Sequence, residues 1–303
     1  MKDTTNDTSL LRTLSDQMAD AVEHVSPTLV QVNGRQRQPG SGLIIGPDLV
    51  LTADHILERN DNLTIQLHDQ RTLPAQFVGR DRGTDLALLR VSDLQTTPAT
   101  PSTIEARVGQ LTIALGRSNS EGPMASVGII SAIGGPLRTG TGTVLERYIR
   151  TDAIPYPGFS GGPLIDTAGH VIGMLTTGLA NGVPLAIPYT IAQRIADTLV
   201  QYGHIKRGYL GMASQLVQIP AEQRANRSQE QGLLVVSVED DSPARRAALL
   251  VGDIVLTIDG QTINDFEDLH LTLNGERVGK TVPVEIVRGG TLQTLSVTIG
   301  QRP

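Results

Sequence analysis

The sequence predicts a mainly β protein of two domains, the larger being a β-sandwich or barrel. From Thr28 onward, short runs of β-branched and aliphatic residues recur, separated by Gly, Pro, Asn or Asp. Many short strands with turn signals between them are typical of such folds. The chain has 303 residues, more than one hydrophobic core usually serves, which favours a second domain.

Composition excludes several classes of function. The formal net charge is -6, there is no Trp, and no long run of Lys or Arg occurs, which argues against a nucleic-acid or anionic-membrane surface. The chain has no Cys, so disulfides, thiolate metal sites and a cysteine nucleophile are excluded. The 6 His are scattered, with no H-E-x-x-H motif, P-loop or dinucleotide fingerprint. We therefore expect no metal and no cofactor.

The N-terminal segment, residues 1–26, is expected to be helical. Apolar residues recur at helical spacing from Leu10 to Val25, which predicts an amphipathic helix over 9–24 that ends before Pro27. Its apolar side is expected to dock on the protein's own barrel, with a subunit contact as the alternative. No apolar run resembles a signal peptide or a membrane span. The chain as written is therefore expected to be cytoplasmic, or periplasmic or otherwise extracytoplasmic if it is a mature or truncated form, and its compartment stays open.

The first domain is expected to occupy 27–202. Gly46-Pro47-Asp48 is a hairpin signal, and helical spacing returns only at 190–201, after which Gly203 marks a stop and a domain boundary at 203. The predicted strands include L-V-Q-V, G-L-I-I-G, L-V-L-T, L-T-I-Q-L, A-L-L-R-V, L-T-I-A-L, V-G-I-I-S-A-I and H-V-I-G-M-L.

The stretch T-D-A-I-P-Y-P-G-F-S-G-G-P-L-I-D places Ser160 among glycines. Glycines let the backbone turn tightly and expose its amides. If Ser160 attacks a carbonyl, the N–H groups of Gly158 and Ser160 would form the oxyanion hole. The alternative is a glycine-rich turn without chemistry.

Two other residues complete a catalytic set. His55 follows the apolar run L-V-L-T, and Asp85 precedes the run L-A-L-L-R-V. Taken alone, the histidine could be structural and the acid a cap, with Asp81 a nearby competitor. A serine nucleophile needs a base, and the base needs a carboxylate to orient it. The order His, Asp, Ser is that of the chymotrypsin-type barrels.

The motifs T-A-D-H-I-L, T-D-L-A-L-L-R-V and P-G-F-S-G-G-P-L resemble those of the HtrA/Deg serine proteases. Further stretches resemble this family at Gly40 to Gly46, Val127 to Gly134, Thr151 to Ala153 and Leu185 to Pro188. The resemblance implies two six-stranded antiparallel β-barrels packed face to face, with His55 and Asp85 from the first and Ser160 from the second. It also implies a homotrimer and an oxyanion turn that switches between inactive and active shapes.

The sequence departs from the family pattern at three positions. Phe159 and Tyr156 stand where Asn is usual, and Asp54 precedes the histidine in place of a small or amide residue. Asp54 adjoins His55 in the chain, so its side chain is expected to point away from the imidazole. We therefore expect Asp85, and not Asp54, to orient His55.

Substrate preference follows from Ile154, at the offset before Ser160 where trypsin-like enzymes carry the acid that selects Lys or Arg. An apolar residue there predicts a small S1 pocket that accepts Val, Ala, Ile or Leu. Met174, Leu175 and Thr176 are the expected walls.

After the boundary, 203–303 resembles a PDZ domain, an α+β fold, through R-G-Y-L-G-M and the long stretch from Gly232 to Gly260. Ser242-Pro243-Ala244 should start a helix, Gly252-Asp253 a turn and Asp259-Gly260 a hairpin. The pair Asn264 and Glu267 predicts a groove helix over 266–274. A peptide would add as a strand along Gly208 to Ser214, with its carboxylate held by the N–H groups of Tyr209, Leu210 and Gly211.

Three functions remain open to the sequence. The first is an ATP-independent serine endopeptidase that removes unfolded or damaged proteins. The second is a chaperone or peptide-binding scaffold with weak hydrolysis, and the third is an esterase, which a peptide-binding domain disfavours. The glycine-rich segment 136–148 is expected to relay PDZ occupancy to the oxyanion turn, by resemblance only.

Overall fold

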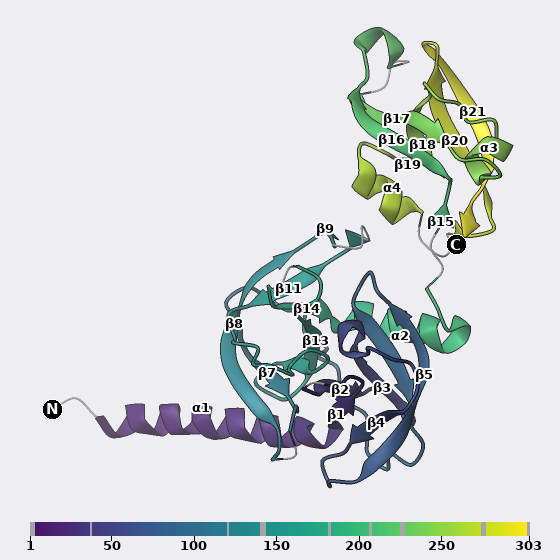
Figure 1. Cartoon of the computed structure of the whole chain (residues 1–303). Helices are drawn as coiled ribbons and strands as arrows, with labels where there is room; N and C mark the ends of the chain where they lie inside the picture. The colour runs from purple at the N-terminus through teal and green to yellow at the C-terminus, as the bar shows by residue number, and fades with distance from the viewer. Residues whose placement is uncertain are drawn as a thin grey trace. The chain divides into compact units, whose positions relative to one another are not determined.

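The computed structural model describes residues 4–36, 38–119, 121–139, 144–180, 183–205, 208–224, 228–273 and 277–301. Contacts divide the chain into two compact units, Met1–Ile205 and Lys206–Pro303, each described here by itself (Figure 1). The division lies a few residues beyond the Gly203 boundary expected from the sequence. In the described ranges, no helix is both long and apolar enough to cross a membrane.

The first unit contains two barrels, and the first of them is closed, with the strand order β1-β2-β3-β6-β5-β4. Every neighbouring pair in it is antiparallel. Alternate side chains point inward and fill the barrel with aliphatic residues, among them Val32, Ile44, Val50, Ile65 and Leu89. The strands are β1 (Leu29–Asn33), β2 (Gly40–Ile44), β3 (Leu49–Ala53), β4 (Leu63–Gln66), β5 (Thr72–Asp81) and β6 (Leu86–Arg90).

A second closed barrel follows in the order β11-β14-β13-β12-β7-β8, so the predicted pair of six-stranded antiparallel barrels is confirmed. Two short strands, β9 (Leu137–Arg138) and β10 (Val144–Leu145), pair outside it, and residues 140–143 of the expected relay segment lie outside the described residues. The barrel strands are β7 (Leu111–Gly116), β8 (Met124–Gly134), β11 (Tyr148–Thr151), β12 (Pro163–Ile165), β13 (Val171–Thr176) and β14 (Leu185–Pro188).

The two barrels share one hydrophobic core. Leu43, Leu51 and Leu88 of the first barrel lie in the same buried cluster as Met174 and Ile187 of the second. Helix α2 (Tyr189–Tyr202) contributes Ala192, Ile195 and Leu199 to this cluster and ends where Gly203 adopts φ +73°. Because the core spans both barrels, residues at the strand ends along the seam are held at fixed positions.

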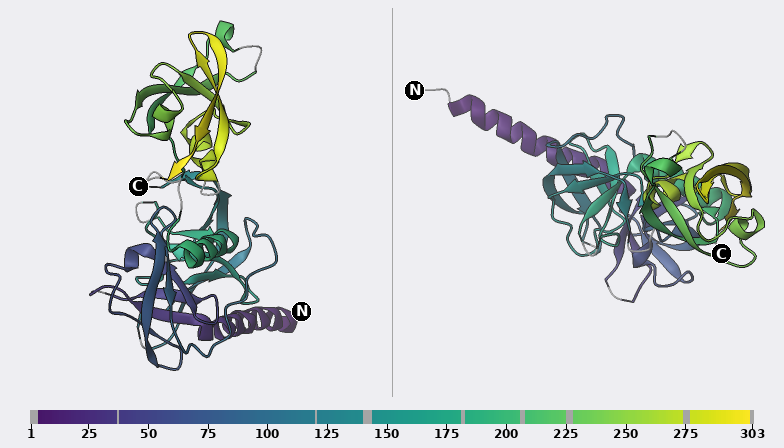
Figure 2. Two further views of the ribbon diagram at one scale, coloured as in Figure 1. Left: turned by 90° about the vertical axis from the view of Figure 1, so that its right-hand side faces the viewer. Right: turned by 90° about the horizontal axis from the view of Figure 1, so that it is seen from above.

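Helix α1 (Thr4–Val25) is longer than predicted and docks only at its C-terminal end. Ala21 and Val25 are buried there, just before the short 3-10 helix η1 (Ser26–Thr28). Leu10 and Leu11 are 67% and 70% exposed, so the apolar side packs on the barrels as expected only toward the C-terminal end of the helix. Figure 1 and Figure 2 show the N-terminal part of this helix projecting away from the barrels.

The second unit is a five-strand path, β16-β17-β18-β20-β21, with β19 paired to β18 and a separate β15-β22 pair. A bidentate ion pair stabilises this unit. Arg288 Nε and Nη2 each lie 2.7 Å from a carboxylate oxygen of the buried Asp253. The strands are β15 (Gly208–Tyr209), β16 (Met212–Gln218), β17 (Gln231–Val238), β18 (Ile254–Ile258), β19 (Gln261–Thr262), β20 (Thr281–Arg288), β21 (Thr291–Thr298) and β22 (Gly300–Gln301).

The helices of this unit lie close to the predicted places. The helix α3 (Pro243–Arg246) starts at Ser242, whose hydroxyl accepts the N–H of Arg245 at 3.1 Å. The helix α4 (Phe266–Thr272) begins where the groove helix was expected, while Asn274 lies outside the described residues. The 3-10 helix η3 (Ala221–Gln223) was not predicted.

Candidate active site

His55 and Asp85 meet at the ends of two paired strands. Ala53 of β3 lies opposite Leu86 of β6, so the residues just beyond these ends are neighbours. His55, in the 3-10 helix η2 (Asp54–Ile56), has its Nδ1 2.7 Å from Asp85 Oδ2, and its backbone N–H donates to Asp85 Oδ1 at 2.9 Å. A carboxylate on Nδ1 keeps the proton there and leaves Nε2 free to act as a base.

Asp85 is 5% exposed and receives a third bond, from the hydroxyl of Thr176 to Oδ2. Three donors fix the orientation of this carboxylate. The competitor Asp81 instead accepts the N–H of Gly83 at 3.1 Å and the hydroxyl of Thr84 at 2.8 Å. Asp81 therefore closes its own turn.

Ser160 reaches the same place from the second barrel. Its Oγ lies 3.3 Å from the hydroxyl of Thr177, the residue after Thr176. A Cβ added to Gly178 would lie 2.8 Å from His55 Nδ1 and 2.6 Å from Asp85 Oδ2. The segment Thr176 to Gly178 thus contacts all three predicted residues, which the structure brings around one strand end.

The turn before Ser160 is bonded through its carbonyl groups. Ser41 donates its N–H to Ser160 O at 3.0 Å and its hydroxyl to Gly158 O at 2.6 Å. Within the described ranges, the N–H groups of Gly158 and Ser160 have no protein acceptor. Gly158 has φ +91°, and a Cβ there would lie 2.1 Å from Ser118 Cβ, so only glycine fits. Two unused amides in one turn are what an oxyanion hole requires.

The packing of Phe159 accounts for an aromatic side chain at a position where the family usually has Asn. Its side chain is fully buried, packs edge-on against Tyr156 with ring centroids 5.6 Å apart, and lies where a Cβ on Gly116 would fall 2.3 Å from the ring. The phenyl ring is thus part of the barrel core beneath the turn, where it anchors the backbone of the neighbouring Ser160.

The four residues expected to form the S1 pocket lie in different surroundings. Ile154 is 59% exposed, while the neighbouring Asp152 has its carboxylate bonded to the N–H of Ile129 at 2.6 Å. Met174 and Leu175 are 0% and 2% exposed, and Thr176 binds Asp85, so the expectation that these three form pocket walls is wrong. The reason is that β13 pairs with β12 and β14 on its two sides, and its side chains fill cores on both faces.

Sequence reasoning missed two polar residues at the site. Ser41 supports the oxyanion turn, and Thr177 bonds the Ser160 hydroxyl. The signal for Thr177 was the sequence T-T-G directly after an apolar strand, where hydroxyls leave the core.

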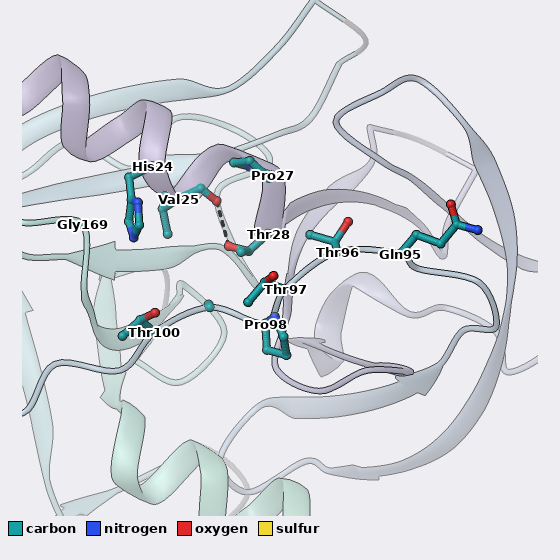
Figure 3. Close-up of a pocket in the computed structure, with 11 residues that line it drawn as sticks. His24, Val25, Pro27, Thr28, Gln95, Thr96, Thr97, Pro98, Thr100 and Gly169 are labelled. Atoms are coloured by element: carbon teal, nitrogen blue, oxygen red, sulfur yellow. Dashed lines mark hydrogen bonds between the residues drawn. The ribbon is translucent and has the colours of Figure 1, made fainter.

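A cavity of about 370 Å³ lies away from these residues (Figure 3). It lies between the C-terminal end of α1 and the chain at 95–100, and its lining includes no predicted site residue. The residues are His24, Val25, Pro27, Thr28, Gln95, Thr96, Thr97, Pro98, Ala99, Thr100 and Gly169.

The side chain of Asp54 pairs with Arg80, while Asp85 bonds the imidazole. Asp54 is 8% exposed, and its Oδ1 lies 2.9 Å from Arg80 Nη1. Burial raises the pKa of Asp54 above its ordinary value of 3.8; Arg80 opposes this rise and the charge of Asp85 adds to it.

This direction predicts how stability changes with pH. A carboxyl whose pKa is higher in the folded state contributes stability below its unfolded pKa and loses it as pH rises through the folded pKa. We expect the free energy of unfolding of the wild type, relative to Asp54→Asn, to fall as pH rises from below 3.8 toward neutrality. Urea denaturation of both proteins across this range measures the difference. A difference that stayed constant or grew with pH would contradict the assignment.

The four residues predicted to bind a peptide in the PDZ unit form two pairs that differ in their backbone hydrogen bonds. Gly208 donates its N–H to Leu273 O at 3.0 Å, and Gly208 and Tyr209 pair with β22, so the expectation of a peptide strand beginning at Gly208 is wrong. The carbonyls of Leu210 and Gly211 are bonded to Ala244 and Glu239, while in the described part of the chain their N–H groups have no protein acceptor. Strand β16, which follows them, is at the edge of its sheet.

Comparisons with known proteins agree with both units. The trypsin-like peptidase domain family matches residues 40–174, and the PDZ domain family matches residues 214–299. The structure of the HtrA-type protease AlgW with tripeptide is 31% identical, with a TM-score of 0.80, and the match covers 94% of this chain and 97% of that one. The serine endoprotease from Yersinia pestis is 27% identical, with a TM-score of 0.78 and coverages of 94% and 98%.

Curated relatives agree with the same family. The probable periplasmic serine endoprotease DegP-like of Halomonas elongata is 34% identical over 275 residues, which cover 88% of this chain and 57% of the relative. The corresponding protein of Pseudomonas putida (strain W619) is 35% identical over 280 residues, covering 89% and 58%. The chain spans just over half the length of these relatives. It belongs to the HtrA/Deg family of serine proteases, with one trypsin-like peptidase domain and one PDZ domain.

Proposed function

We propose that this protein is an ATP-independent serine endopeptidase that degrades unfolded or damaged proteins. Ser160 is the nucleophile, His55 the general base and Asp85 the residue that orients it. The observation that carries the proposal is the His55–Asp85 bond of 2.7 Å beside the segment that also contacts Ser160 Oγ.

The geometry supports acyl transfer in two steps. The Ser160 hydroxyl turns from Thr177 toward His55, gives its proton to Nε2 and attacks the peptide carbonyl. The N–H groups of Gly158 and Ser160 stabilise the oxyanion, and Asp85 stabilises the imidazolium. The imidazolium then protonates the leaving amine. A water molecule, deprotonated by His55, releases the acyl group and restores the Ser160 hydroxyl.

A second candidate is a chaperone or peptide-binding scaffold with weak hydrolysis. It is favoured by the resting bond of Ser160 Oγ, which goes to Thr177 Oγ1. Digestion of casein without nucleotide, by the wild type and by Ser160→Ala, separates the two. Degradation that requires Ser160 supports the protease, and equal rates would exclude it.

We expect cleavage after small apolar residues, mainly Val, Ala, Ile or Leu. The exposed Ile154 offers an apolar contact, and the carboxylate of Asp152 is bonded to the backbone, so neither residue attracts a basic side chain. Mass spectrometry of casein fragments identifies the residue before each cut, with Ser160→Ala as the blank. Predominant cleavage after Lys or Arg would refute this preference.

The PDZ unit is proposed to bind C-terminal peptides by adding a strand to the edge of β16, with the carboxylate at the N–H groups of Leu210 and Gly211. The structures of the similar protease AlgW with a tripeptide and with a decapeptide support peptide binding by this family. Titration calorimetry with a hydrophobic peptide and its C-terminally amidated form tests the proposed mode, since only the free carboxylate should bind.

The homotrimer and the relay through 136–148 are proposed by family resemblance. Loss of peptide stimulation on deletion of 203–303 tests the relay.

A further inference from the structure

The carboxylate of Asp54, the residue before His55, is held by Arg80 through an ion pair without a well-directed hydrogen bond. The distance from Arg80 Nη1 to Oδ1 is that of an ion pair, while the geometry at Oδ1 satisfies no hydrogen bond. The side chains of Asp54 and Arg80 are 10% and 20% exposed, respectively. The attraction is therefore one between charges in a poorly solvated place, where each charge has a long reach.

The turn on which His55 stands is fixed on both sides of the histidine. Asp54 N–H donates to Asp85 O at 3.0 Å, and Leu57 N–H donates to Asp54 O at 2.9 Å. The side chain of Asp54 adds the contact to Arg80 on β5. The Asp54 side chain thus links the turn that carries His55 to β5, a strand that neither of the two backbone bonds reaches.

Arg80 has further anchors of its own. Its Nη2 donates to Asn60 Oδ1, its guanidinium carbon lies 4.8 Å from the Phe77 ring centroid, and its backbone forms a bridge with His204. A cation held in this way is a fixed reference point for the Asp54 carboxylate.

Charge balance around the histidine follows from this arrangement. The ionisable groups facing Asp54 are Arg80, Arg82, Asp81 and Asp85, with His204 next to the backbone of Arg80. Asp85 is bonded to the imidazole, and Asp81 is occupied by its own turn. A second carboxylate in the residue next to His55 would favour the imidazolium, the form that cannot act as a base. Arg80 supplies the opposite charge, 2.9 Å from the Asp54 carboxylate.

We propose that Asp54 is a positioning residue for His55, which it holds through a charge-compensated ion pair with Arg80. The proposal rests on the function proposed above, in which His55 is the base. Removal of one partner leaves the other charge unpaired, with a known sign, next to the turn that carries His55.

The experiment compares four proteins: the wild type, Asp54→Asn, Arg80→Gln and the double variant. Asp54→Asn leaves the cation, so the acidic limb of the kcat/KM profile should move to lower pH by about 0.5 to 1 unit. Arg80→Gln leaves the anion, so the limb should move to higher pH by a similar amount. The double variant should return close to the wild type, and both single variants should lower kcat more than they change KM.

Controls separate this role from a structural one. Arg80→Lys keeps the charge and should leave the limb in place, although it loses the planar fork. Arg90→Gln breaks a half-exposed pair with Asp48 in the same barrel, at 3.0 Å, and should also leave it in place. Single variants that shift the limb in the same direction, or not at all, would overturn the proposal.

A second readout does not depend on hydrolysis. Nuclear magnetic resonance of histidine-labelled protein follows the His55 ring during titration, with His55→Gln identifying its signal. Opposite shifts in the two single variants are expected here as well. If the wild type hydrolyses nothing, the proposed function fails, while the ring titration still decides whether the ion pair acts on His55.

Discussion

Replacing Ser160 by Ala is expected to lower kcat for an unfolded protein substrate by about 10⁴- to 10⁶-fold. The change removes a single oxygen, the atom that attacks the carbonyl. The bonds that shape the turn use the Ser160 carbonyl and the Ser41 side chain, so the oxyanion amides keep their places. Steady-state hydrolysis of a labelled casein measures the loss, and the unfolding temperature should stay close to that of the wild type.

Thr177→Val is the matched control for Ser160→Ala. It removes the other hydroxyl of the 3.3 Å pair and keeps the nucleophile, so the rate should stay within about tenfold of the wild type. Peptide binding by the PDZ unit should persist in both variants. If Ser160→Ala retained the wild-type rate, Ser160 would have no part in the reaction.

The chemistry of the site could be predicted from residue types and chain order more readily than its walls. His55, Asp85 and Ser160 each lie beside an apolar run, and a strand that ends at the surface delivers a polar residue to a cleft. The structure places all three around Thr176 to Gly178. The distances arise because the two barrels share a core, which no local pattern contains.

The errors have a common physical origin. The near-continuous apolar run of β13 does not tell which side chains face a core and which face a cleft, so the sequence predicts Met174 and Leu175 in a pocket that they do not line. Helical spacing in α1 predicted an amphipathic helix but not where its partner surface ends, and Leu10 and Leu11 remain exposed. The resemblance predicts that Gly208 pairs with a peptide, but β22, near the C-terminal end of the chain, pairs with it instead.

Replacing Asp85 by Asn is expected to lower kcat by about 10⁴-fold without unfolding the protein. The amide keeps an oxygen for the N–H of His55 but presents an NH₂ group to Nδ1 in place of a carboxylate oxygen. The imidazole must then carry its proton on Nε2, where it cannot accept the proton of Ser160. Asn also tolerates the backbone of this position, φ +56°, so the turn should persist.

Asp81→Asn distinguishes orientation of the base from general damage to the turn. Asp81 lies four residues before Asp85, is equally buried, at 5%, and bonds Gly83 and Thr84. Its replacement removes a negative charge from the same loop but leaves His55 and its carboxylate untouched, so the rate should remain within about tenfold of the wild type. Kinetics of both variants on one peptide substrate decide the assignment. A reversal of the two effects would make Asp81 the residue that orients His55, and the 2.7 Å bond between His55 and Asp85 would then be structural.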